Sequence, residues 1–131
     1  MTIAYMIVRV IFGLWFTYAG IEYFIPGLQP FGTTAIAQQF THALVDSGLM
    51  LIVKIMELIG GVLILLNRAV LPSALAMLPL SVVIAFWNIV LDPVPPVGYA
   101  FGVVTPLFNL ILIWPYRERL MPLMVWKPAS A

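Results

Sequence analysis

Four ionisable side chains lie within otherwise apolar stretches of the sequence: Arg9, Glu22, Lys54 and Glu57. A charged side chain at the middle of a membrane helix costs about 2.5–3.5 kcal/mol on insertion scales, so such residues are candidates for pairing or for function. Lys54 and Glu57 are three positions apart and therefore share one face of a helix. Such groups can donate hydrogen bonds to a ligand, orient it or exchange a proton with it.

Depth along the helices predicts how these four groups pair. At 1.5 Å per residue, Lys54 and Glu57 lie roughly 8 and 12 Å from one membrane surface, and Arg9 lies roughly 9 Å from the other. In a hydrocarbon layer of about 30 Å, Arg9 then comes within reach of Glu57, and Lys54 within reach of Glu22. We expect both ion pairs inside a polar interior that also contains Tyr18, Asn88, Thr105 and Asn109. Of these four, Tyr18 and Asn109 join the charged residues as candidate ligand contacts.

Two interpretations of the buried charges stay open. They can be structural pairs that only hold helices together, or they can form a site for a quinone, a lipid headgroup, a proton or another small ligand. Four ionisable groups are more than two helices need for association, and this observation keeps the ligand interpretation open.

The composition identifies an integral membrane protein. The chain has 131 residues, of which 63% are hydrophobic and 8% are charged, whereas soluble domains carry about 25% charged residues. A net charge of +1 without a basic cluster excludes nucleic acid as an expected partner. There is no cysteine and only one histidine, His42. We therefore expect no metal site, no intrinsic cofactor and no catalytic residues, so that any redox chemistry must depend on a bound quinone or on a partner.

Four segments are apolar and about long enough to span a membrane as helices. They predict an all-α, integral membrane four-helix bundle that forms a single domain with a C-terminal tail at residues 117–131. The first segment has no basic start and no cleavage site, so we interpret it as a span rather than a signal peptide. The expected spans are residues 3–25, 49–66, 70–91 and 99–116.

The connections between the spans predict the orientation. Thr33 and Thr34 can begin a short amphipathic helix in the first connection, with Ile36, Phe40 and Leu44 on one face. Arg and Lys favour the cytoplasmic side. They occur in the second connection and the tail, at Arg68, Arg117, Arg119 and Lys127, but not in the first and third connections. Both termini are therefore expected in the cytoplasm, with the short helix in an outer loop.

Two stretches of the sequence resemble the DoxX family of small four-helix bacterial membrane proteins. The stretch RVIFGLWFTYAG, from Arg9 to Gly20, is similar to the first-helix pattern of that family. The stretch MELIGGVLILLNR, from Met56 to Arg68, is similar to its second-helix Glu, Gly–Gly pair and basic turn. The family commonly has a Lys shortly after the first-helix Gly, whereas this chain has Ile21 and Glu22 there.

The resemblance implies a multi-pass protein of the bacterial cytoplasmic membrane that is a subunit or accessory of a redox or respiratory assembly. In this interpretation a quinone or lipid binds beside Arg9, Lys54 and Glu57, and the chain is not a stand-alone enzyme. Membrane lipids, redox subunits or further copies of the chain are the expected partners. Two alternatives are a carrier or receptor for a small apolar or weakly charged molecule, and a purely structural membrane subunit.

Overall fold

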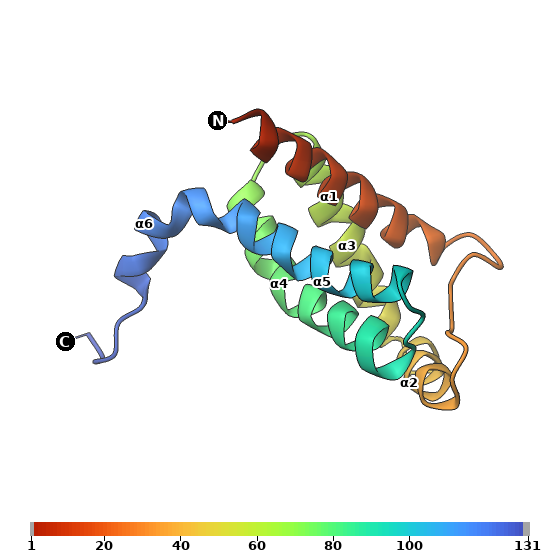
Figure 1. The fold of residues 1–131 in the computed structure, drawn as a ribbon. Helices are drawn as coiled ribbons and strands as arrows, with labels where there is room; N and C mark the ends of the chain where they lie inside the picture. The colour runs from red at the N-terminus through yellow and green to blue at the C-terminus, as the bar shows by residue number, and fades with distance from the viewer. Residues whose placement is uncertain (1, 130–131) are drawn as a thin grey trace.

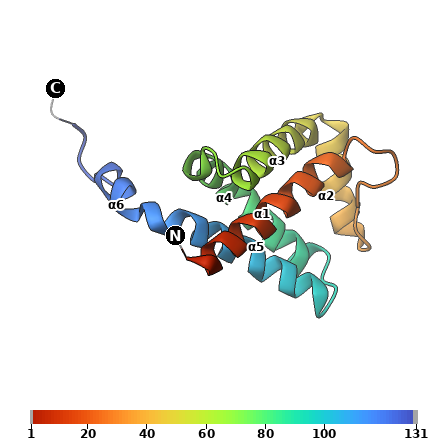
Figure 2. The ribbon, with the colours of Figure 1, turned by 90° about the horizontal axis from the view of Figure 1, so that it is seen from above.

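Four long helices lie side by side and make up most of the molecule (Figure 1). The computed structural model describes residues 2–129, and this part of the chain contains helices and no strands. Helix α1 packs against α3 and α5, and α4 packs against the same two helices, so the four form a closed ring (Figure 2). Their bounds are Ile3–Glu22 for α1, Leu49–Leu65 for α3, Val70–Phe86 for α4 and Val97–Ile113 for α5.

Three helical stretches are long and apolar enough to cross a membrane by themselves. The 17-residue α3 reaches this length only together with α2, which meets it at a bend of 87°. Large apolar side chains also cover the outside of these helices, as a lipid environment requires. The protein is therefore a multi-pass membrane protein with three or four candidate spans. The three stretches are Ile3–Glu22, Val70–Leu91 and Val97–Leu123.

Helix α2, Ala35–Asp46, lies across one end of the bundle (Figure 1). The Thr34 side chain accepts a hydrogen bond from the backbone N–H of Ala37 at 3.2 Å and so caps the start of α2. Gly48, with φ of 84°, supplies the left-handed residue at which the chain bends into α3. The short helix is present as predicted, with Phe40 and Leu44 of its predicted face half-buried, but Ile36 does not share that burial. Ile36 is 53% exposed, and Ala37 and Thr41 are buried instead.

The turn between α3 and α4 is a Schellman motif, which explains its shortness. Asn67 has φ of 57°, and its N–H donates to the Ile64 carbonyl at 3.1 Å. The N–H of Arg68 donates to the Leu63 carbonyl at 2.8 Å. These bonds satisfy carbonyls that a helix end otherwise leaves unpaired.

The helix ends differ from the expected spans at two places. Helix α1 stops at Glu22 rather than Ile25, because Pro26 disfavours helical backbone just before it. After α5 the chain continues in helical turns through the last residues of the expected fourth span and on to Leu123, inside the segment that we expected as a tail. This segment leaves the bundle (Figure 1). It contains three short helical elements: η2 at Trp114–Tyr116, α6 at Arg117–Leu120 and η3 at Met121–Leu123.

The apolar core joins all four long helices. Its largest fully buried side chains include Phe12 and Phe16 of α1, Ile64 of α3, Met77 of α4 and Leu112 of α5. The rings of Phe12 and Phe16 lie 4.5 Å apart. This packing fixes the position of α1 along the axis of α3. It therefore also determines which charged residues of the two helices can meet.

Candidate functional site

Glu22, Lys54 and Glu57 meet inside the bundle, and we call them the Lys54 cluster. Lys54 Nζ lies 2.9 Å from Glu57 Oε2 and 3.5 Å from Glu22 Oε1. It also donates a hydrogen bond to the Ala19 carbonyl at 2.9 Å. The predicted pair between Lys54 and Glu22 is therefore present, and it connects α1 to α3.

Two members of the Lys54 cluster, Lys54 and Glu57, are deeply buried, and Glu22 at the end of α1 is half-buried. Only 6% of Lys54 and 4% of Glu57 is exposed. Removing charges from water is costly, and close opposite charges with hydrogen bonds offset part of that cost. The cluster holds two carboxyl groups and one amine, so its charges do not balance within the chain.

The predicted pair between Arg9 and Glu57 is wrong. Arg9 is buried, and its Nη1 donates to the carbonyls of Ile64 and Leu65, both at 2.7 Å. These carbonyls lie at the C-terminal end of α3, where the helix dipole also attracts a cation. Depth alone placed Arg9 near Glu57, but the carbonyls at the end of α3 are closer partners. Arg9 therefore caps a helix and lies apart from the Lys54 cluster.

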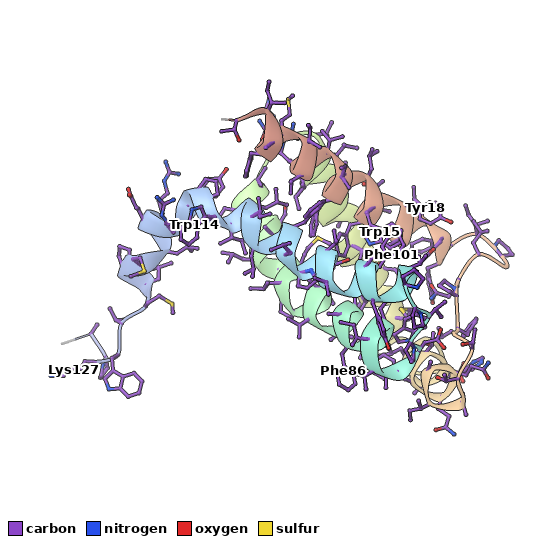
Figure 3. The ribbon with its side chains drawn as sticks, in the orientation of Figure 1. Trp15, Tyr18, Phe86, Phe101, Trp114 and Lys127 are labelled. Atoms are coloured by element: carbon purple, nitrogen blue, oxygen red, sulfur yellow. The ribbon has the colours of Figure 1, made fainter. Side chains whose placement is uncertain are left out.

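A cavity of about 420 Å³ lies beside the Lys54 cluster, which lines it, and we call it the cluster cavity. Trp15 of α1 stacks on Phe101 of α5 in its wall, with ring centroids 4.8 Å apart and planes at 21° (Figure 3). Phe40 of α2 and Gln29 of the first connection also line it. The cavity is thus mainly apolar and aromatic, with one charged region.

Most of the buried polar side-chain atoms that lack a hydrogen-bond partner, among the described residues, belong to residues that line this cavity. Among residues 2–129, four buried side-chain atoms have no hydrogen-bond partner within the chain, and three belong to residues that line the cluster cavity. They are the donor Trp15 Nε1 and the acceptors Gln29 Oε1 and Glu57 Oε2. Lys54 Nζ lies close to Glu57 Oε2 without the alignment of a hydrogen bond. Buried polar groups normally have partners, so three exceptions in residues that line one cavity set this region apart from the rest of the described chain.

The other polar residues of the predicted interior are dispersed. Tyr18 points away from the bundle and is 52% exposed, so its expected place in the interior is wrong (Figure 3). Asn109 is fully buried between α4 and α5, where it accepts from Ser81 at 2.5 Å and donates to the Ala74 carbonyl at 2.8 Å. Thr105 donates to the Phe101 carbonyl of its own helix. Of the four, only Asn88 lines the cluster cavity.

Asp92 forms a second polar centre, which the sequence analysis did not identify. Its Oδ1 accepts hydrogen bonds from the Thr33 hydroxyl at 2.6 Å, from the Thr33 N–H at 2.7 Å and from the Thr34 N–H at 2.9 Å. The bond from the Thr33 hydroxyl, helped by the two backbone N–H groups, lowers the pKa of Asp92 although burial opposes this. Asp92 thereby fixes the start of α2 to the end of the π-helix η1, Trp87–Leu91. The available signal was that Asp92 directly follows the third expected span, residues 70–91, and so lies at the same end of the bundle as Thr33 and Thr34.

A further link holds α2 in place over the cluster cavity. Trp87 Nε1 donates to the Thr41 hydroxyl at 3.3 Å, and both residues line the cavity. The Thr34 hydroxyl also donates to the Leu91 carbonyl. The first connection and α2 therefore form a roof over the cavity at this end of the bundle.

Two other possible sites offer less. A hollow of about 630 Å³ at the opposite end lies between the start of α1 and the end of α5, and its lining includes no charged residue. His42 is exposed and stacks on Phe31 with centroids 4.3 Å apart. Within residues 2–129, no group of three His, Cys, Asp or Glu side chains could hold a metal ion.

These observations define a class: a small, all-helical, multi-pass membrane protein with a charged cluster buried beside a cavity. The sequence profile of the DoxX family matches residues 4–90, more than half of the chain. The chain therefore belongs to the DoxX family, as its sequence motifs predicted. The matched range includes Glu22, Lys54 and Glu57. Comparisons with curated proteins and with solved structures find no match.

Proposed function

We propose that this DoxX protein is a membrane subunit that binds a small, largely apolar molecule by its polar head in the cluster cavity. The observation that supports this most directly is that three residues lining one aromatic cavity each hold a buried polar atom without a hydrogen-bond partner among the described residues. Ligand sites are typically apolar hollows with a few convergent polar groups. A purely structural cluster gives no reason for hydrogen-bonding capacity to remain unused at a cavity.

A quinone is the ligand that best combines this geometry with the family. Its flat ring fits beside Trp15 and Phe101, whose own rings are stacked. Trp15 Nε1, which has no partner among the described residues, is the group that would donate to a carbonyl oxygen, and Lys54 Nζ would do so by exchanging one of its three present contacts. Glu57 and Gln29 would accept hydrogen bonds from the hydroxyl groups of the reduced form, and Glu57 would exchange the proton. Arg9, which we first considered as a donor, is committed to the end of α3.

The proposed setting is a redox assembly in the bacterial cytoplasmic membrane. The chain has no cysteine and one histidine, so electrons would travel on the bound ligand or on a partner subunit. The protein would serve as an accessory rather than a stand-alone enzyme. The basic residues of the α3–α4 turn and the tail favour a cytoplasmic location of that end.

A second candidate function is a carrier or receptor for a weakly charged molecule. It is favoured by the unequal number of carboxyl and amino groups in the Lys54 cluster. The two functions share the cavity and differ in the molecule that occupies it.

Native mass spectrometry of gently solubilised protein tests the proposal. Wild type should retain a small molecule, identified by its mass, and Glu57→Gln should lose it while staying folded. Glu118→Gln makes the same change at an exposed residue of the tail and should behave as wild type. A chain that carries no small molecule in any of the three forms would contradict the ligand proposal. Retention of larger subunits alone would favour a structural role.

A further inference from the structure

The charges that line the cluster cavity do not cancel. Glu22, Lys54 and Glu57 are the charged residues of its lining, so two carboxyl groups face one amine. Lys54 contacts both carboxyl groups. Arg9 cannot compensate, because it binds carbonyls at the far end of α3. With both carboxyl groups ionised, the cavity has a formal charge of −1.

The unpartnered hydrogen-bonding atoms are also unequal in kind. Two are acceptors, Gln29 Oε1 and Glu57 Oε2, and one is a donor, Trp15 Nε1. Glu57 is 4% exposed and lines the cavity, and its Oε2 lies 2.9 Å from Lys54 Nζ without forming an aligned hydrogen bond. Charges interact strongly where water is excluded. A negatively charged head would be repelled there and would leave both acceptors unmatched.

We propose that the cluster cavity selects a molecule whose head donates hydrogen bonds and carries no negative charge. This inference rests on the proposed ligand-binding function and specifies the chemical class of its ligand. The head is a hydroxyl or an amine, attached to a planar apolar body that fits beside Trp15 and Phe101. An ammonium head is further stabilised by the faces of aromatic rings. For a quinone pair, the selected member is the reduced form with two hydroxyl groups.

Three naphthalene derivatives that differ only in the head group test this selectivity. They are 1-naphthol, 1-naphthylmethylamine and 1-naphthoic acid, which at neutral pH are a neutral donor, a cation and an anion. Affinities for purified protein in neutral detergent micelles are measured by calorimetric titration and corrected for partition into protein-free micelles. The naphthol or the amine should bind at least about tenfold more tightly than the naphthoate, which corresponds to about 1.4 kcal/mol. A tighter amine identifies charge as the selecting force, and a tighter naphthol identifies hydrogen-bond donation.

Glu57→Gln should reduce this preference, because it removes the excess charge and adds a donor. Glu118→Gln is the matched control and should leave the preference unchanged. Gln29→Leu removes the other free acceptor from a connection outside the long helices, and provides the test if Glu57→Gln does not fold. It should weaken the naphthol relative to the naphthoate.

The outcomes separate this inference from the function on which it rests. Tight binding of the naphthoate, or equal binding of all three compounds, would overturn the selectivity while leaving the cavity as a binding site. Failure of all three compounds to bind would overturn both.

Discussion

At the scale of single residues, Lys54 is the centre of the buried charged cluster of this protein. It connects Glu22 on α1 with Glu57 on its own helix and also binds the Ala19 carbonyl. Removing one partner of a buried ion pair leaves an uncompensated charge, which typically costs about 3–5 kcal/mol. Lys54 is therefore both a structural link and the reason that Glu57 can be buried beside a cavity.

Two double-mutant cycles distinguish the observed pairing from the one that depth suggests. Lys54→Met with Glu57→Gln should give a coupling free energy of about 1–3 kcal/mol, because the two groups are in direct contact. Arg9→Met with Glu57→Gln should be additive within about 0.5 kcal/mol, because the two residues share no partner. The free energies come from reversible unfolding by sodium dodecyl sulfate in mixed micelles. A strong coupling between Arg9 and Glu57 would contradict the structure.

The site could be predicted from the sequence only in part. Depth and helix direction are properties of the sequence, and they correctly paired Lys54 with Glu22. They could not show that Arg9 would bind carbonyls, since this depends on how closely α1 approaches the end of α3. Nor does depth show which way a side chain points, and so Tyr18 was placed inside although it faces outward.

At the scale of elements, glycines set the distance between α1 and α3. A Cβ atom at Gly61 would lie 2.5 Å from the Thr17 backbone nitrogen, and one at Gly20 would lie 2.7 Å from the Leu58 nitrogen. In both places the neighbouring atom is backbone, so no flexible side chain can move aside. This close contact holds Glu22 within reach of Lys54.

Replacing Gly61 by alanine should therefore separate the two helices. We expect Gly61→Ala to destabilise the protein by about 1–3 kcal/mol, the usual range for overpacking. Gly98→Ala is the control, because its Cβ would meet its nearest neighbour at an ordinary 3.4 Å. Thermal melting in detergent should show a loss for the first variant and little change for the second. Equal melting of both variants would show that the glycine contact does not set the helix distance.

The attachment of α2 through Asp92 should depend on pH. The folded protein lowers the pKa of Asp92 from its ordinary value of 3.8. The stabilisation is therefore complete above pH 3.8 and is lost as the pH falls through the lower, folded-state pKa. The amide proton shifts of Thr33 and Thr34 in nuclear magnetic resonance should titrate together with a midpoint below 3.8.

Asp92→Asn should abolish this titration and leave the helices intact, which provides the control. A midpoint above 3.8 would mean that burial, rather than the hydrogen bonds, dominates at this carboxyl group.

The elements themselves were easier to predict than their contacts. Apolar length and the prolines and glycines between the segments indicate the long helices, and Thr34 indicates the start of α2. The link from Asp92 to Thr33 and Thr34 joins residues 58 and 59 positions apart. No local pattern indicates such a contact, because it depends on how the first connection folds back over the bundle.

At the scale of the whole molecule, charge is distributed unequally between the two ends. The end with the α3–α4 turn and the tail carries Arg68, Arg117 and Arg119, whereas the end with α2 carries Asp46 and Asp92. The tail leaves the bundle at the basic end, and its Trp114 and Lys127 lie along that segment (Figure 3). This distribution supports the proposal that the tail faces the cytoplasm.

Single cysteines test the orientation directly, because the chain contains none of its own. Ser47→Cys at the α2 end should react with a membrane-impermeant maleimide in intact bacterial cells. Met124→Cys in the tail, where the native side chain is 78% exposed, should react only after the membrane is permeabilised. The reverse labelling pattern would invert the proposed topology.

The unmatched atoms at the cluster cavity also affect how stable the protein is when purified. Each buried polar group without a partner costs about 1–3 kcal/mol, so the protein without a bound molecule has a free-energy deficit that a suitable ligand can remove. By mass action, a ligand at a hundred times its dissociation constant adds about 2.7 kcal/mol to the free energy of unfolding. Under the proposed function, the melting temperature therefore reports occupancy of the cavity. We expect a preparation that loses the proposed ligand during extraction to become less stable while its helices remain intact.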